Sequence, residues 1–127
     1  MQRGNPFIIQ RLNKSNPQNI AITIITATEQ LVGRLNVINR ATSSNDLVFA
    51  YARLKDTLED LNNLNVLALS HDAGKIYAEL VKQRIRIGTQ YLRIAAITLS
   101  VNCILATCNW KDFEKVANLT LEDWTIS

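Results

Sequence analysis

The 127 residues of the chain are enough for one domain with a single hydrophobic core. A hydrophobic content of 47% with 20% charged residues excludes a chain that is disordered throughout. No apolar run approaches the roughly 18 residues of a membrane-spanning helix, and the first residues lack the pattern of a signal peptide. The formal net charge of +3 is too small to predict a nucleic-acid partner by itself.

The first third of the chain predicts a helix, a strand and a second helix. Residues 6–14 begin with a proline and place three apolar side chains on one face, which indicates a short helix. Residues 20–25 are rich in β-branched side chains and predict a strand. Thr26 has the pattern of an N-cap, because Glu29 follows three residues later and completes a capping box. We therefore expect a helix over 27–40 with Glu29 in its first turn.

The middle of the chain begins with a long amphipathic helix. Its apolar residues follow a 4-3-4-3 spacing, which predicts a continuous apolar seam along the helix. We expect this helix and the preceding one to form an antiparallel hairpin. The seam consists of Leu47, Tyr51, Leu54, Leu58 and Leu61. A short strand over 65–69 and a helix over 73–86 follow.

The last third contains an almost uncharged run of helix length over 91–101. A short apolar strand follows over 103–107, then a polar turn, and residues 119–124 predict an edge strand. An uncharged helix that leads into an apolar strand indicates that both are covered, as in the middle of an α/β sandwich. Ligands in such folds bind beyond the carboxyl ends of the strands. The whole order predicts an α/β domain.

The cysteines and the histidine lack the pattern of a zinc site. Cys103 and Cys108 do not have a CxxC spacing, and His71 is the single histidine, so the sequence does not predict a zinc site. Two such cysteines agree with a reducing, cytoplasmic location. Four cations without an acid between residues 80 and 93 indicate either a patch that attracts anions or solvated helix ends. They are Lys82, Arg84, Arg86 and Arg93.

Five sequence segments, in order, resemble the PIN domain and specifically its VapC-type toxins. They are Thr26–Gly33, with an acid followed by glycine four residues later; Val66-Leu67; Gly88 with Leu92–Ala96; Leu105–Asn109 with Asp112-Phe113; and Leu119–Trp124. The resemblance covers almost the whole chain. It implies a three-layer α/β/α domain over 1–127 with a mostly parallel sheet, in which the family's first, central strand is absent. The chain is N-terminally truncated relative to the family in this reading.

Members of this family are endoribonucleases that depend on Mg²⁺ or Mn²⁺, which bind carboxylate oxygens, activate a water and hold the scissile phosphate. The family's acids map onto Glu29 and Asp112 as catalytic and metal-binding residues, with Asn109 nearby. Tyr91 stands where a further metal-binding aspartate belongs, and a phenol carries no charge near neutral pH. The acid of the first strand has no counterpart. We therefore expect the metal to be held weakly, if at all, and ribonuclease activity to be weak or lost.

An absent central strand would leave unpaired backbone on its two neighbours, at roughly 1–3 kcal/mol for each buried group. The neighbours would have to close up, borrow a strand from a partner, or leave the chain unstable. The resemblance implies RNA, an antitoxin protein and a second copy of the chain as partners, and no membrane. Whether the chain is an enzyme stays open. It is an impaired ribonuclease, a non-catalytic module that pairs with itself or an antitoxin, or a chain whose start has been assigned too late.

Overall fold

The computed structural model describes residues 8–11, 20–107 and 110–123. Strands and helices alternate irregularly along these residues. In chain order they are β1 (Ile8–Arg11), β2 (Ile20–Thr23), α1 (Ile24–Arg40), α2 (Ser44–Asn62), β3 (Asn65–Leu67), α3 (His71–Lys82), α4 (Thr89–Ser100), β4 (Ile104–Thr107), α5 (Trp110–Phe113) and β5 (Thr120–Asp123). Within these residues, no helix has the length and hydropathy needed to cross a membrane.

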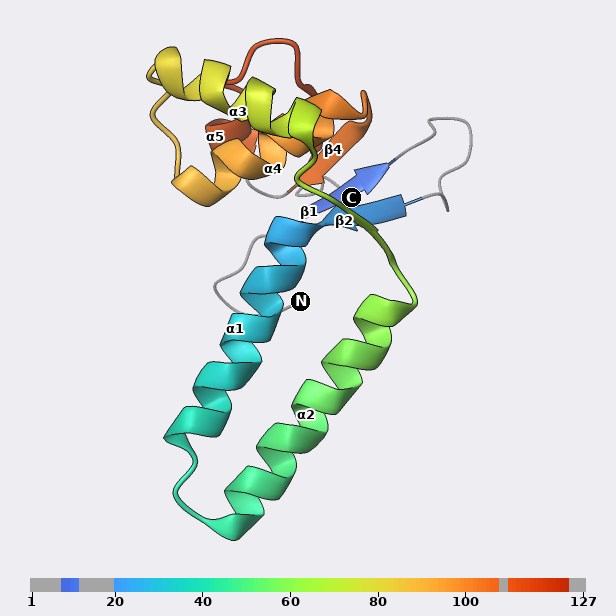
Figure 1. Cartoon of the computed structure of the whole chain (residues 1–127), viewed down its shortest axis with the longest axis vertical. Coiled ribbons are helices and arrows are strands. Elements are labelled where there is room, and N and C mark those ends of the chain that lie inside the picture. The colour runs from blue at the N-terminus through green and yellow to red at the C-terminus, as the bar shows by residue number, and fades with distance from the viewer. Residues whose placement is uncertain (1–7, 12–19, 108–109, 124–127) are drawn as a thin grey trace.

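The five strands form one sheet in the order β3-β2-β1-β4-β5 (Figure 1). β2 pairs with β3 and β4 pairs with β5, both in parallel. β1 lies at the centre and is antiparallel to both of its neighbours. Four strands therefore point the same way, and the central one points the opposite way. β5 is an edge strand, as the sequence predicts.

β1 corrects the prediction of a helix over 6–14, because Ile8–Arg11 is a strand; the other residues of that range lie outside the described part of the chain. Ile8 pairs with Thr107 and Arg11 with Ile104, so β1 contacts β4 along its full length. On its other side, Arg11 pairs with Ile20. β1 lies between β2 and β4, two strands that would otherwise have unpaired backbone groups facing each other. Pairing with both strands favours a strand here, because an isolated helix of this length is marginal in water.

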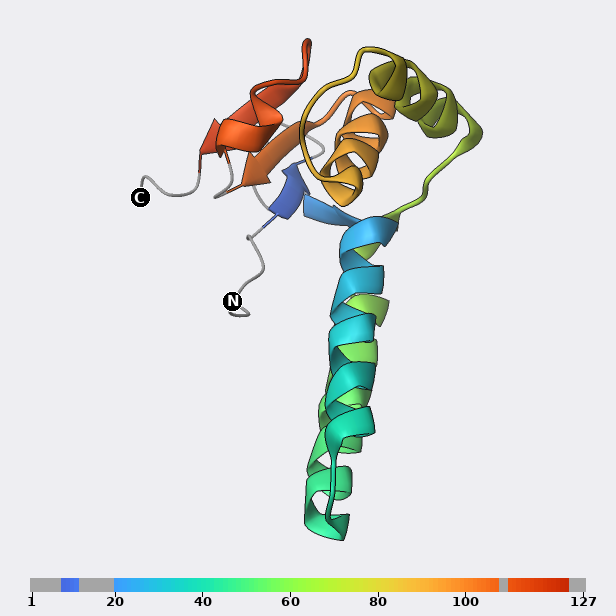
Figure 2. The ribbon, with the colours of Figure 1, turned by 90° about the vertical axis from the view of Figure 1, so that its left-hand side faces the viewer.

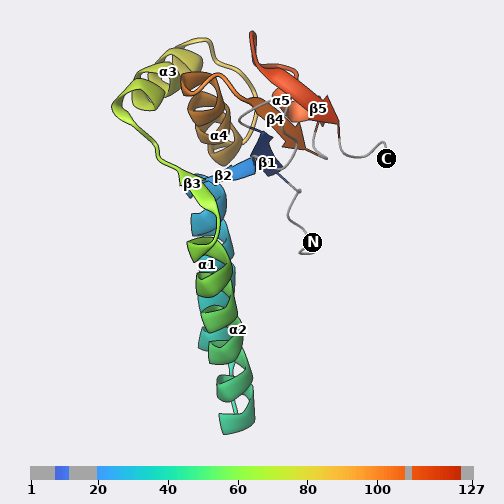
Figure 3. The ribbon, with the colours of Figure 1, turned by 90° about the vertical axis from the view of Figure 1, so that its right-hand side faces the viewer.

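The core lies between α4 and the strand that follows it. Six residues of α4 are buried, which confirms that the uncharged run is a covered helix: Leu92, Ile94, Ala95, Ala96, Ile97 and Thr98. Leu105 of β4 and Phe113 of α5 are fully buried in the same cluster. α3 lies on the outer side of α4 and contributes Leu80 (Figures 2 and 3). A charge on the inner face of α4 would have no water and no partner here.

α1 and α2 form an antiparallel hairpin that projects away from the sheet (Figures 1 and 2). Thr57 is buried where the two helices meet, and the Nε of Arg34 donates a hydrogen bond of 2.9 Å to its Oγ1. The hairpin is confirmed. Three residues of the predicted seam, Leu47, Tyr51 and Leu58, are 41%, 56% and 50% exposed, whereas Leu54 and Leu61 are partly buried.

Candidate functional site

The carboxyl ends of β2 and β4 lie at the same edge of the sheet, because both strands are antiparallel to β1. α1 begins directly after β2, and α5 begins three residues after the end of β4. The two acids predicted from the sequence, Glu29 and Asp112, lie on these two helices. They are therefore carried by elements that leave the same edge, on strands separated by β1.

The start of α1 differs from the prediction. Thr23, not Thr26, is the N-cap: its Oγ1 accepts a hydrogen bond of 3.2 Å from the backbone N–H of Thr26. The two hydroxyls also lie 3.3 Å apart. The helix begins at Ile24 because the hydroxyl of a buried threonine at the strand end satisfies one of its first free N–H groups. Glu29 therefore lies in the second turn and is not part of a capping box.

Glu29 is half-buried, and this burial raises the pKa of its carboxyl above the ordinary value of 4.5. Removal of water disfavours the charged form of an acid unless an opposite charge is near. Among the residues that the structure describes, none forms a hydrogen bond or ion pair with the Glu29 side chain. A cation beside this carboxylate would lower the pKa again and would itself be held by the charge.

Asp112 is half-buried in the single turn of α5. Its neighbour Phe113 is fully buried in the core, so the packing of Phe113 fixes the position of the turn. The carbonyl of Asp112 accepts a hydrogen bond of 3.4 Å from the N–H of Lys115. Asn109, the third residue predicted for the site, lies outside the described residues.

Tyr91 lies in the first turn of α4, a turn without an acid. Its ring centroid is 5.2 Å from that of Phe113, with the two planes at 54°. The start of α4 is therefore next to α5, the helix that carries Asp112. The family resemblance implies a carboxylate at position 91. The chain has an aromatic ring there, which packs on the core.

The described residues fit a divalent metal poorly. They include no group of three or more His, Cys, Asp or Glu side chains placed to hold an ion. Two carboxylates and water can hold Mg²⁺ only loosely. Two threonines that the sequence reasoning did not select, Thr23 and Thr107, are fully buried at the ends of β2 and β4. Their signal in the sequence is a polar residue that closes an otherwise apolar strand.

The four cations between residues 80 and 93 have different surroundings. The Nη1 of Arg93 donates a hydrogen bond of 3.0 Å to the Oε1 of Gln90, and its guanidinium lies 5.7 Å from the ring centroid of Tyr77. The other three cations are exposed in and after the last turn of α3. Cations near a helix C-terminus interact favourably with the negative end of the helix dipole.

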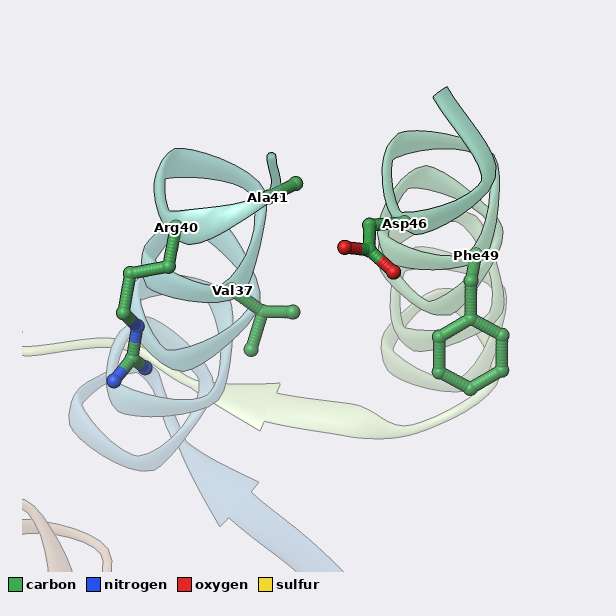
Figure 4. A pocket seen from close by; sticks show the side chains of 5 residues that line it. All are labelled: Val37, Arg40, Ala41, Asp46 and Phe49. Carbon is green, nitrogen blue, oxygen red and sulfur yellow. The ribbon is translucent and has the colours of Figure 1, made fainter. Parts of the chain in front are cut away.

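A shallow, open pocket of about 270 Å³ lies at the far end of the hairpin (Figure 4). Val37 and Arg40 line it from α1, and Asp46 and Phe49 line it from α2. Arg40 is eleven residues beyond Glu29 in the same helix, which corresponds to roughly 16 Å. The pocket is therefore separate from the candidate site.

Known proteins resemble the chain in sequence and in fold, although no family model matches it. Two proteins named Ribonuclease VapC1, from Haemophilus influenzae strains R2866 and 86-028NP, are each 29% identical to it over 127 residues, with 98% of this chain and 90% of the relative covered. A chain in the structure of VapBC-1 from nontypeable Haemophilus influenzae superposes with a TM-score of 0.66 at 26% identity, and covers 83% of this chain and 74% of that one. The chain has a VapC-type PIN fold.

Two further structures support the VapC-type PIN fold. VapBC2 from Rickettsia felis, solved with a DNA fragment from its promoter, gives a TM-score of 0.61 at 26% identity over 82% of this chain and 74% of that chain. VapBC-5 from Mycobacterium tuberculosis gives 0.57 at 23% identity over 81% and 79%, and supports the fold alone. The α/β fold class predicted from the sequence is confirmed.

Proposed function

We propose that this VapC-type protein descends from metal-dependent endoribonuclease toxins and has an incomplete acidic site, so that its RNA cleavage is weak or lost. The relatives named Ribonuclease VapC1 support the origin. The ring of Tyr91, packed against Phe113 at the start of α4, is the observation on which the loss depends. Glu29, Asp112 and Asn109 are the candidate metal-binding residues, and Glu29 and Asp112 are the candidate catalytic residues.

Within the described part of the chain no group of three or more metal-binding side chains forms a site for Mg²⁺ or Mn²⁺, so we derive no hydrolytic step through a metal. Burial raises the pKa of the Glu29 carboxyl, so a cation beside it would be favoured, but position 91 supplies a phenol in place of a carboxylate. The second candidate function is a non-catalytic module that pairs with an antitoxin or with a second copy. The Haemophilus influenzae and Rickettsia felis neighbours favour the pairing with an antitoxin, because both are VapBC structures.

The test compares the wild type with Tyr91→Asp in an RNA-cleavage assay with Mn²⁺ or Mg²⁺. We expect the wild type to cleave at or near background, and Tyr91→Asp to bind Mn²⁺ roughly tenfold more tightly, because a third carboxylate completes the donor set. The loss of the Mn²⁺ electron paramagnetic resonance signal on titration measures binding without any need for activity.

The control pair is Glu29→Gln and Glu59→Gln. Glu59 is exposed and forms an ion pair of 3.1 Å with Lys55, so its amide variant changes the charge without touching the candidate site. Metal-dependent cleavage by the wild type that Glu29→Gln abolishes and Glu59→Gln preserves would refute the proposed loss of activity. Equal Mn²⁺ binding by the wild type and Tyr91→Asp would refute the role given to position 91.

A further inference from the structure

The segment that joins α3 to α4, residues 83–88, combines side chains that pack on the core with cations that face the solvent. Ile85 and Ile87 are partly buried and pack against the core cluster. Arg84 and Arg86 alternate with them in the sequence and are exposed. Because the two isoleucines anchor the backbone, the segment presents both arginines from a fixed part of the fold.

Hydrogen bonds fix the segment further and bring a third cation to it. The N–H of Arg84 donates to the carbonyl of Val81 at 3.0 Å. The Nζ of Lys115, in the turn after α5, donates a hydrogen bond of 3.1 Å to the carbonyl of Arg86. The ammonium group of Lys115 therefore lies beside the segment, although it comes from a distant part of the sequence. We call Arg84, Arg86 and Lys115 the cationic ridge.

The charges of the cationic ridge have no ion-pair partner among the residues that the structure describes. The dipole of α3 accounts for Lys82, which lies in the last turn of that helix. This effect fades within about one turn, and Arg86 lies four residues beyond the helix end. Glu114 precedes Lys115 in the chain and offsets part of its charge. The ridge as a whole keeps a positive charge that the fold does not neutralise.

Arg84 has a left-handed backbone conformation, with a φ of 55°. It is the second residue after α3, a place where glycine is preferred because glycine adopts this conformation without a steric cost. An arginine there destabilises the backbone, and within the described residues its side chain gains no ion pair in return. This favours a role for its charge outside the fold of the chain.

The cationic ridge lies beside the candidate site. Its segment passes α5 on the way from α3 to α4 (Figure 2). α5 carries Asp112, and Tyr91 in the first turn of α4 packs on Phe113 of α5. A polyanion that binds along the ridge would therefore lie next to the elements that carry the candidate acids.

We propose that the cationic ridge binds the phosphate backbone of RNA, and that it does so whether or not the chain cleaves that RNA. Arginine and lysine hold phosphate oxygens through charge and hydrogen bonds. The apolar side chains of residues 83–88 face the core, so the segment lacks the apolar centre that a protein partner would bury, whereas a phosphate backbone requires charges alone. The choice of RNA rests on the proposed function, but binding needs neither a metal nor a catalytic residue.

The experiment is a fluorescence anisotropy titration of a labelled single-stranded RNA of roughly 16 nucleotides with the full chain. EDTA is present throughout, so metal-dependent cleavage cannot affect the result. We expect the wild type to bind, and Arg84→Gln with Arg86→Gln to bind about tenfold more weakly. The slope of log affinity against log salt concentration should become shallower by about 1.4, the value for two lost phosphate contacts on a single strand.

The matched control is Arg40→Gln with Arg53→Gln, which removes the same charge from exposed arginines of the α1–α2 hairpin. This variant should bind RNA within about twofold of the wild type. Far-ultraviolet circular dichroism checks that all variants are folded. A wild type that does not bind RNA would overturn the proposal, and so would equal losses in the ridge variant and the hairpin control.

Arg84→Gly separates the charge of the ridge from the stability of the fold. Glycine relieves the left-handed backbone, so the midpoint of thermal unfolding should stay the same or rise, while RNA affinity falls roughly threefold. A lower midpoint with unchanged affinity would show that Arg84 serves the fold, and the proposal would be wrong.

Poly-glutamate is the competing anion in the same titration. If it displaces the RNA at an equal concentration of charges, the ridge takes an acidic protein segment and the proposal is wrong. Binding in EDTA is independent of the metal-dependent cleavage test, so this proposal and the proposed loss of activity can fail separately.

Discussion

Glu29 and Tyr91 show how single side chains decide what the edge of the sheet can do. Glu29 is half-buried and has a raised pKa, whereas the acids of α2 are exposed to water. Tyr91 places its ring against Phe113 and so contributes to the core rather than to a charged site. Glu29 is thus an acid in a setting that disfavours its charge, and Tyr91 contributes packing instead of a charge.

The raised pKa of Glu29 makes a prediction about stability. A carboxyl whose pKa is higher in the folded chain contributes stability below the unfolded value of 4.5, and this is lost as the pH rises through the folded pKa. We therefore expect Glu29→Gln to be more stable than the wild type near pH 7 and to show no such advantage near pH 4. Thermal unfolding midpoints at the two pH values test this.

The exposed Glu59→Gln is the control, and its difference from the wild type should not grow between the two pH values. A wild type that exceeds Glu29→Gln in stability near pH 7 would show instead that the Glu29 charge is stabilised in the fold.

The sequence predicts Glu29 and Asp112 as site residues, and the structure places both after strands that end at the same edge. The sequence does not predict where α1 begins. Thr23 and Thr26 are both plausible N-caps by residue type, and the choice depends on where the strand stops pairing with its neighbours, which is a long-range property. The setting of Tyr91 is likewise beyond local pattern, because Phe113 is far from it in sequence.

At the scale of elements, the hairpin shows why an apolar period does not reveal what it packs against. The 4-3-4-3 spacing correctly predicts a long helix but not its contact. The two helices are joined by a polar contact, from Arg34 to Thr57. Three of the larger seam residues, Leu47, Tyr51 and Leu58, are exposed, and Leu54 and Leu61 are partly buried.

The hydrogen bond between Arg34 and Thr57 should stabilise the hairpin. Thr57 is buried, and its Oγ1 accepts from Arg34 and donates to the carbonyl of Arg53 at 3.0 Å. Thr57→Val keeps the shape and removes both bonds, so we expect it to lower the free energy of unfolding by about 1–2 kcal/mol. Urea unfolding followed by circular dichroism measures the change.

Thr28→Val serves as the control for that loss. Thr28 is exposed, and its hydroxyl donates a hydrogen bond of 2.7 Å to the carbonyl of Ile24 in its own helix. Its replacement should change stability by no more than about 0.5 kcal/mol. Equal effects of the two valine variants would mean that the bond between the helices contributes nothing.

At the scale of the whole molecule, β1 holds the two halves of the sheet together. Without it, the pair β2–β3 and the pair β4–β5 would have no hydrogen bonds to each other. The family resemblance correctly predicts the α/β fold, and the sequence pattern of residues 119–124 predicts the edge strand. Neither predicts β1, because residues 6–14 are locally compatible with a helix, whereas Ile8–Arg11 becomes a strand where two open strands offer partners.

A proline in β1 should therefore be more damaging than one at the edge. Gln10 pairs with Leu105 on one side and Ala21 on the other, so Gln10→Pro removes a backbone donor in a central strand. We expect a loss of about 3 kcal/mol or more. Thr120→Pro, at the first residue of the edge strand β5, should lose clearly less. Chemical denaturation of both variants decides, and equal losses would contradict a central position for β1.

The central position of β1 also sets an order of events during synthesis. Ile8 and its partner Thr107 are about 100 residues apart in the chain. The β1–β4 ladder cannot form until the ribosome has made most of the protein, and contacts so distant in sequence form slowly. For much of translation, one side of β1 is consequently an open strand edge, the kind of surface that recruits other nascent chains and that chaperones protect.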